Sequence, residues 1–295
     1  MHPAPNQVKL SAHVTRTEGQ QNGKYPYGNP LTVTAGNTTV LLDSGVGIDP
    51  SDADLLLLSH YHEDHVAGIG ARRGPTAIHE FDLPAIQSWN TFRTFCDLEP
   101  GPWEADMREQ FQWTEMSGAT AFDHGSTFEV GDSTTITVVP LPGHTAGHCG
   151  FLVEPDGVFY LADVELSSFG PFYGDRHSSL ADTRATLQTC ATIDAAVYTT
   201  FHHKGPYTSA SEFRRALAHH GQVLDDREDR ILTLLLTLDG ARIEDLVDKG
   251  VVYRLGRRPW YADHVERSMC RRHLDELVSN GVVTGPDPEG FYRIV

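Results

Sequence analysis

Residues 60–65 read His-Tyr-His-Glu-Asp-His, and this short stretch decides the fold prediction. Five of its six side chains carry imidazole or carboxylate groups, and four of these form an H-x-H-x-D-H pattern: His60, His62, Asp64 and His65. Zinc and iron accept these ligands. Two histidines at positions i and i+2 can hold one ion, and the Asp and His that follow can face a second ion nearby. The stretch comes directly after the apolar run 55–58, which is typical of a strand covered on both faces.

Two more β-rich runs end in a residue of the same kind. The run 134–141 leads into Pro-Gly and then His144, and a sharp turn there can project His144 as a third ligand of the first metal. The apolar run 158–162 ends at Asp163. A buried carboxylate is costly unless it is paired or bound to a metal, and Asp163 could bridge two ions. Because these runs are strands, their ends can meet at one edge of a sheet sandwich.

A last strand, 195–201, ends at His202 and His203. Successive side chains on a strand point to opposite faces, so only one of the two can join the cluster. We prefer His203 because it directly precedes a Lys-Gly-Pro turn, and His202 remains the alternative.

The order of these motifs resembles the metallo-β-lactamase superfamily. H-x-H-x-D-H is followed by P-G-H-T-x-G-H at 142–148, by an Asp after an apolar strand, and by a late His, over about residues 8–205. The resemblance implies an α+β fold, an αββα sandwich with the site at one sheet edge. It also implies a first metal site of His60, His62 and His144, and a second of Asp64, His65 and the late His. Asp163 would bridge the two, and Asp43 would support a ligand histidine.

Two residues narrow the subgroup that the resemblance implies. The flavodiiron branch uses H-x-E-x-D, whereas this chain has His62 at the third position. The main antibiotic-hydrolysing lactamases place a Cys where this chain has Asp163. The chain is therefore more similar to the lactamase-β-like or glyoxalase II-like branch, whose members with an Asp bridge favour thioesters, lactones and other esters.

The expected function is hydrolysis by metal-bound hydroxide, since zinc lowers the pKa of bound water to about 7. We expect one or two zinc ions, with iron or manganese as alternatives. Asp64 would orient the hydroxide or carry a proton to the leaving group. Tyr173 or His148 would donate to the developing oxyanion, although His148 is also interpreted as a structural residue beside the ligands.

Other functions of this fold stay open from the sequence. A persulfide dioxygenase of this fold binds a single iron and reacts with oxygen, so metal content separates it from a two-zinc hydrolase. A nuclease or phosphodiesterase is disfavoured by the formal net charge of −17, which repels nucleic acid and anionic membranes. A member that binds metal without turnover ranks last.

The pattern divides the chain at about residue 221. We expect a catalytic domain over 1–221, with an aromatic-rich helical insertion over 89–120 that either walls a pocket or packs an extra helix onto the core. Helical runs and a final hairpin over 222–295 predict a winged-helix-like unit. That unit is net negative, so packing, pocket shaping or dimerisation is favoured over DNA binding.

No apolar run is long enough to span a membrane, and no secretory signal is visible at the start. We therefore expect a cytoplasmic protein that acts on a small molecule, with a homodimer as an open alternative. The four cysteines are far apart and form no C-x-x-C pair, so neither a disulfide framework nor a cysteine-rich zinc site is expected.

Overall fold

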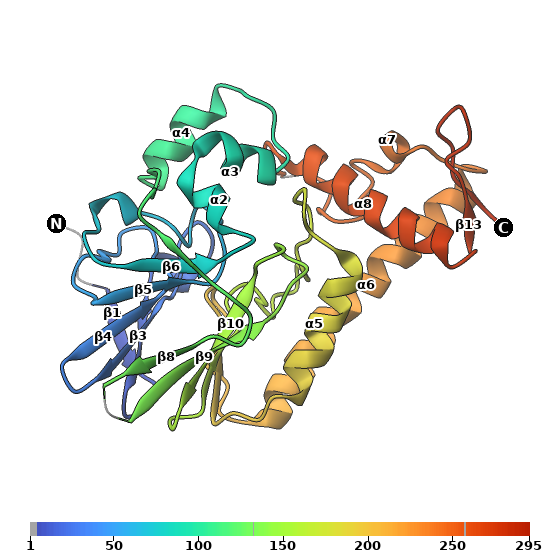
Figure 1. The fold of residues 1–295 in the computed structure, drawn as a ribbon. Coiled ribbons are helices and arrows are strands. Elements are labelled where there is room, and N and C mark those ends of the chain that lie inside the picture. Colours follow the sequence, from blue (N-terminus) through green and yellow to red (C-terminus); the bar gives the residue numbers. More distant parts are fainter. Residues whose placement is uncertain (1–4, 132, 257) are drawn as a thin grey trace.

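The computed structural model of the chain describes residues 5–131, 133–256 and 258–295. Two β-sheets pack face to face, and helices cover the outer face of each sheet (Figure 1). This is the αββα sandwich that the sequence predicts. A helical unit at the C-terminus extends from one end of the sandwich.

The first sheet has seven strands in sequential order. They are β1 (Asn6–Lys9), β2 (Val14–Glu18), β3 (Leu31–Ala35), β4 (Thr38–Leu42), β5 (Leu55–Leu58), β6 (Thr76–His79) and β7 (Thr120–Phe122). The expected hairpin about Gly36 and Asn37 is confirmed as β3–β4, which pairs Val33 with Val40. The strands β4 to β7 run parallel to one another.

The second sheet has five strands in the order β12-β11-β10-β9-β8. They are β8 (Thr127–Val130), β9 (Thr134–Pro140), β10 (Cys149–Glu154), β11 (Val158–Tyr160) and β12 (Val197–Thr199). Strands β11 and β12 are parallel, with Tyr160 opposite Thr199. The chain segments that leave these two strands therefore start from the same edge of the sheet, as do those that leave β4 and β5.

Alternation of side chains along the central strands builds the layers. Val40 and Leu42 point into the core between the two sheets, whereas Leu41 between them packs against the helices on the outer face. The second sheet behaves likewise, because Tyr160 faces the inter-sheet core and Phe159 faces the outer helices. A run that is apolar at every position is thus explained by burial on both faces.

Helices α2 (Leu83–Gln87), α3 (Trp89–Phe95) and α4 (Trp103–Gln110) cover the first sheet, and α5 (Leu180–Thr192) and α6 (Ala210–Thr237) cover the second. One-turn segments α1 (Gln20–Gly23) and η1 (Ile69–Ala71) lie in loops. The aromatic-rich insertion is helical as expected. Trp89, Phe92 and Trp113 are buried in the same cluster as Leu56 and Leu58 of the sheet.

The C-terminal unit consists of the end of α6, α7 (Ile243–Leu246), α8 (Ala262–Ser279) and the two-stranded pair β13 (Val283–Thr284) and β14 (Arg293–Ile294). This element order matches the expected one, and it is what supports the winged-helix comparison, which stays a proposal. Helix α6 runs unbroken across residues 221 and 222, so the expected boundary falls inside a helix. The apolar periodicity that starts after residue 222 belongs to a helix that begins a full twelve residues earlier, at Ala210.

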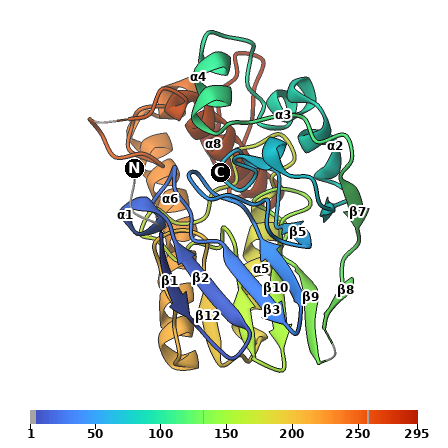
Figure 2. The same cartoon turned by 90° about the vertical axis from the view of Figure 1, so that its left-hand side faces the viewer.

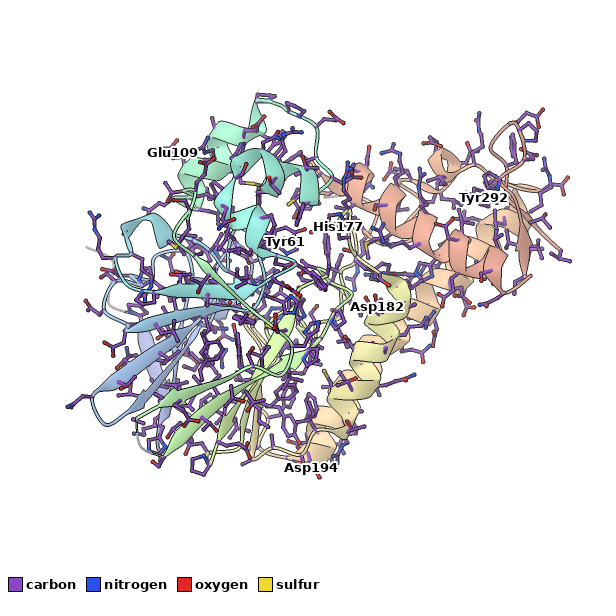
Figure 3. The ribbon with its side chains drawn as sticks, in the orientation of Figure 1. Tyr61, Glu109, His177, Asp182, Asp194 and Tyr292 are labelled. Carbon is purple, nitrogen blue, oxygen red and sulfur yellow. The ribbon has the colours of Figure 1, made fainter. Side chains whose placement is uncertain are left out.

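The insertion and the C-terminal unit lie at the same end of the sandwich, as the view in Figure 2 also shows. Trp103 of α4 stacks on Trp260 just before α8, with ring centroids 5.3 Å apart. His177, labelled in Figure 3 between the two units, packs edge-on against Phe95 with ring centroids 4.6 Å apart. In the part of the chain that the structure describes, no helix is both long and apolar enough to cross a bilayer.

Candidate metal centre

Three histidines bring their ring nitrogens to one point at the edge of the sandwich. His60 Nε2 lies 3.0 Å from His62 Nδ1, and His144 Nε2 lies 3.1 Å from the first and 2.9 Å from the second. Asp163 Oδ2 is 3.4 Å from His144 Nε2 and 3.9 Å from His60 Nε2. The sequence-predicted residues of the first site therefore converge.

The remaining ring nitrogens fix the tautomers of these histidines. His144 Nδ1 lies 3.1 Å from the carbonyl oxygen of Phe172, which can only accept a hydrogen bond. His62 Nε2 lies 2.6 Å from the Asp175 carboxylate. In their neutral forms, both rings therefore donate outward and present a lone pair toward the cluster.

The tautomer of His60 is fixed by its contact with Ser59. Ser59 Oγ donates to the Asp43 carboxylate at 2.8 Å, so His60 Nδ1, 3.0 Å away, donates to Ser59 Oγ. The inward nitrogen of His60 then also carries a lone pair. Three lone pairs about 3 Å apart repel one another, and a cation between them removes that repulsion. The donor set thus fits a divalent metal ion.

A second group lies beside the first, on the other oxygen of Asp163. His65 Nε2 is 2.9 Å from Asp163 Oδ1, and His202 Nε2 is 3.6 Å from it and 3.2 Å from Asp64 Oδ2. His65 donates through Nδ1 to Asp43 Oδ2 at 2.9 Å. The neutral form of His65 therefore also presents a lone pair at its inward nitrogen, and Asp64 Oδ2 is buried without a hydrogen-bond partner. This second set fits a cation for the same reason.

His202, and not His203, belongs to this group, so the sequence-based preference for His203 is wrong. His202 is buried and its Nδ1 donates to the carbonyl oxygens of Gly23 and Tyr27, at 3.0 and 3.1 Å. His203 is only half-buried and lines the outer part of the cavity. The carbonyls that orient His202 come from a loop near residue 25, and strand alternation alone contains no information about that loop.

Tyr173 does not face the cluster, which corrects its expected role as an oxyanion donor. Its side chain is fully buried, and its hydroxyl lies 2.7 Å from His273 Nε2 and accepts from Arg227 Nη1 at 3.1 Å. His273 and Arg227 belong to α8 and α6. Tyr173 thus helps to join these helices and is not among the residues that line the cavity.

His148 is also buried, and it lies behind the cluster. Its Nδ1 donates to the carbonyl oxygen of Leu141 at 2.8 Å, and its Nε2 accepts from the backbone N–H of Asp163 at 3.2 Å. Both ring nitrogens are therefore engaged, which leaves none to donate to a substrate. His148 positions Asp163, in line with the structural alternative and against the donor role.

Backbone geometry at the ligand loops explains the local sequence. Gly143 has φ of +124°, and a Cβ there would lie 2.4 Å from the backbone nitrogen of Thr183, so only glycine allows the turn that presents His144. Ala162 and Asp43 have φ of 46° and 60°. Such positive values cost energy in residues with a Cβ and gather at functional sites.

Asp175 is the most important residue that the sequence analysis missed. It is buried, and its carboxylate accepts from the Tyr61 hydroxyl as well as from His62. Its backbone carbonyl accepts from Arg272 of α8, which also donates to the carbonyl oxygen of Ser178 at 3.0 Å. Asp175 has no fixed spacing from His62, so no motif could have indicated it.

Two further carboxylates support the centre without a sequence signal. Asp82 accepts from Thr145 Oγ1 at 2.6 Å and from the Gly147 N–H at 2.9 Å, which fixes the loop after His144. Burial raises the pKa of Asp82 to about 7. Glu165 places a carboxylate oxygen within 4.8 Å of the donor atoms of Asp163 and His202.

The pKa values of the histidines in the centre differ because their neighbours differ in charge. Burial and the adjacent His62 lower the pKa of His144 to about 3, and burial also holds the pKa of His60 well below its usual value. These rings are neutral at physiological pH, as metal ligands must be. For His202, burial lowers the pKa but the carboxylates of Asp163 and Asp64 raise it to about 10. A cation held by the same carboxylates would compete with that proton.

A cavity of about 680 Å³ opens over the two groups. Its floor includes His62, Asp64, His144, Asp163 and His202. The size is within the range of pockets for small molecules. The arrangement can therefore hold two cations side by side beneath a substrate-sized space.

The chain is similar to curated proteins over about half of its length. It is 27% identical over 180 residues to an atrochrysone carboxyl ACP thioesterase of Aspergillus novofumigatus, covering 56% of this chain and 47% of that protein. It is 30% identical over 117 residues to an N-acyl homoserine lactonase of Agrobacterium fabrum, covering 37% and 39%. The chain spans about half the length of the thioesterase, and less of the lactonase. No protein-family model matches the chain.

Solved structures share the fold over the whole chain. A metallo-β-lactamase family protein from Thermus thermophilus superposes with a TM-score of 0.73 at 19% identity, covering 97% of this chain and 100% of that one. A β-lactamase domain protein from Burkholderia ambifaria gives 0.69 at 14% identity, covering 100% and 95%. Both superpositions include the C-terminal unit. The αββα sandwich, with the histidine and aspartate cluster at its edge, and these similarities show that the chain has the metallo-β-lactamase fold.

Proposed function

We propose that this protein is a metal-dependent hydrolase of carboxylic thioesters or esters, lactones included, with zinc as the metal. The observation that carries the proposal is the pair of donor groups that share Asp163, one oxygen toward each. Two ions held a short distance apart are a common arrangement for metal-assisted hydrolysis. His60, His62 and His144 would hold one ion, and Asp64, His65 and His202 the other.

When bound, such cations polarise a carbonyl oxygen and lower the pKa of a coordinated water. Residues of the chain hold the ligands in place and handle the water and its proton. His148 and Asp43 hold Asp163 and His65 in place through the 3.2 Å and 2.9 Å hydrogen bonds. Asp64 lines the cavity and would orient the attacking water or carry a proton to the leaving group.

The proposed substrate class rests on the activities of similar proteins and on the lining of the cavity. One relative is a thioesterase and another is a lactonase, and both names describe cleavage of a carboxylic acyl bond. The lining of the cavity includes Lys24 as its single Lys or Arg among the described residues. A site for nucleic acid would need several such cations, so a nuclease is disfavoured.

The test combines metal analysis of the purified protein with a panel of thioesters, lactones and phosphodiesters. We expect close to two zinc ions per chain and hydrolysis of a thioester or an ester. Asp64→Ala should reduce kcat by at least a hundredfold with little loss of folded structure. Asp182→Ala, an exposed carboxylate at the start of α5, is the matched control.

Two results would overturn the proposal. A single iron per chain together with oxygen consumption would favour the dioxygenase alternative, and full activity of Asp64→Ala would remove the role given to Asp64. The complete second donor group around His202 is the reason to expect two ions and not one.

A further inference from the structure

The cavity over the metal centre is bounded by segments that are far apart in the sequence. Its apolar wall is defined here as the side chains from the insertion, from the loop before α5 and from the C-terminal unit: Leu98, Met107, Phe169, Phe172, Trp260 and Val265. The wall starts next to the first donor group, because the Phe172 ring lies 5.5 Å from the His144 ring and 6.0 Å from the His62 ring.

Contacts with residues behind the apolar wall hold it in place. Arg227, fully buried in α6, donates to the carbonyl oxygens of Phe169 and Pro171, each at 2.6 Å. Trp103 of the insertion stacks on Trp260 of the C-terminal unit. The two sides of the cavity are thereby joined, so the wall is a preformed apolar surface.

The opposite side of the cavity, beside the second donor group, differs in charge. Lys24 and His203 line it, and the Tyr25 ring lies 6.3 Å from the His202 ring. Lys24 is the single Lys or Arg among the described residues that line the cavity, in a chain of net charge −17. Its charge creates a local positive field in an otherwise acidic protein.

Four of the five carboxylates that line the cavity lie beside other polar side chains of the site. Asp175 accepts from His62, and Glu63 accepts from the Tyr25 hydroxyl at 3.0 Å. Asp64 and Asp163 face the donor groups. These carboxylates belong to the metal centre and its supports, whereas an anionic group of a substrate finds Lys24 on the opposite side of the cavity.

We propose that the substrate is an amphipathic acyl ester or thioester whose hydrophobic acyl group lies on the apolar wall while an anionic group of its leaving part lies at Lys24. This inference rests on the proposed function. In the reaction, water forms a bond to the acyl carbon and the bond from that carbon to sulfur or oxygen breaks. One proton of the water goes to the departing thiol or alcohol, and the carboxylic acid is the other product.

The acyl part is tested with the zinc-loaded protein and a thioester series that carries acetyl, butyryl, octanoyl and phenylacetyl groups. We expect kcat/KM for octanoyl and phenylacetyl to exceed that for acetyl by at least tenfold. Trp260→Ala should lower this ratio by roughly tenfold, since a few methylene-sized contacts have that effect on discrimination. Phe81→Ala is the matched control, because Phe81 is 53% exposed, like Trp260 at 59%, and lies outside the cavity.

A second variant enlarges a side chain of the apolar wall. Met107→Trp, on the exposed helix α4, fills the cavity without removing a buried side chain. It should reduce kcat/KM for the octanoyl substrate more strongly than kcat/KM for the acetyl substrate. Equal kcat/KM along the series, unaffected by either variant, would overturn the acyl assignment.

The anionic part is tested with octanoyl thioesters of N-acetylcysteamine, which is neutral, and of 3-mercaptopropionate, which carries one negative charge. We expect the anionic substrate to have the lower KM at low salt, an advantage that added salt reduces. Lys24→Gln should remove the advantage and Lys9→Gln, on the exposed strand β1, should keep it. A Lys24→Gln protein that still prefers the anionic substrate would contradict this assignment.

The experiments distinguish an error in the proposed function from an error in this inference. If no member of the series is hydrolysed, the hydrolase proposal fails, and the binding proposal is then judged separately. A thioether analogue of the octanoyl mercaptopropionate substrate, with CH₂ in place of the carbonyl, should still quench the fluorescence of wild-type protein more than that of Trp260→Ala. No binding of the thioether would overturn the inference as well.

Discussion

His62 Nε2 and Asp175 Oδ2 lie 2.6 Å apart, although the two residues are 113 positions apart in the sequence. The contact fixes the tautomer of His62, because a carboxylate can only accept the ring proton. The nitrogen that faces His60 and His144 is then left with a lone pair. One buried carboxylate, outside any recognisable motif, thus prepares a ligand of the proposed first metal.

Asp175→Asn should weaken metal binding at the first site. The amide can still form a hydrogen bond with His62, but it carries no charge. It can also present an N–H to the ring, which favours the tautomer with the proton on the nitrogen that faces the metal site. The loss of affinity should be about 10- to 100-fold, as for comparable supporting carboxylates. Competition with a chelator measures it, and Asp182→Asn is the control. Unchanged affinity would mean that His62 is oriented by other contacts.

Arg272 should act on the same site from the C-terminal unit. It donates to the backbone carbonyls of Asp175 and Ser178, and so ties the loop that carries Asp175 to α8. Arg272→Met should therefore lower metal affinity as well as stability, and Arg272→Lys should be intermediate because a single ammonium cannot reproduce the planar fork. The visible spectrum of the cobalt-substituted protein reports the change at the metal. Arg271→Met, its exposed neighbour, should leave that spectrum unaltered.

His202 and His203 provide a paired test of the second site. His202→Ala should reduce bound zinc from two ions to one and abolish most activity, whereas His203→Ala should keep both ions. Metal content after gel filtration distinguishes the variants. The reverse pattern would show that the side chains exchange places in solution.

The stability of the protein should fall in acid, partly because of His273. Burial, aided by Arg227 and Arg184, lowers the pKa of His273 to about 3, whereas an unfolded histidine titrates near about 6.5. Between these values the unfolded chain binds a proton that the folded chain does not, so the free energy of unfolding decreases as the pH falls below 6.5. The slope from one such group reaches about 1.4 kcal/mol per pH unit.

The contribution of His273 to this pH dependence is obtained by comparing the wild type with a variant, because the metal ligands titrate in both proteins. Urea unfolding of the wild type and of His273→Gln should be followed from pH 7 to pH 4. The variant should be less stable at pH 7, because the bond from Tyr173 weakens, and its stability should decline less steeply toward acid. Identical slopes would show that His273 takes up a proton in the folded state.

Removal of the metal should destabilise the whole fold. Without a cation, the lone pairs of His60, His62 and His144 face one another at about 3 Å. Chelation should therefore lower the thermal midpoint, and added zinc should restore it in a concentration-dependent way. Calorimetry at several zinc concentrations measures the effect. A midpoint that does not respond to either treatment would argue against metal binding in the folded state.

The sequence by itself determined the type of the fold and most of the proposed ligands. The leucines of β5 are apolar at every position because the strand is covered on both faces, and the donor residues follow where that strand and two others end. Donor types such as imidazole and carboxylate are visible in the sequence, and so is the Pro-Gly turn before His144. Local rules of this kind require no knowledge of distant contacts.

Tertiary structure alone decided which histidine completes the second group and what holds each ring. The carbonyls of Gly23 and Tyr27 select His202 over His203, and Asp175 reaches His62 only because Arg272 of α8 ties its loop. It also removed Tyr173 and His148 from the cavity. Orientation of a side chain depends on hydrogen bonds from segments a hundred or more residues away, and those partners are set by packing and not by any local spacing.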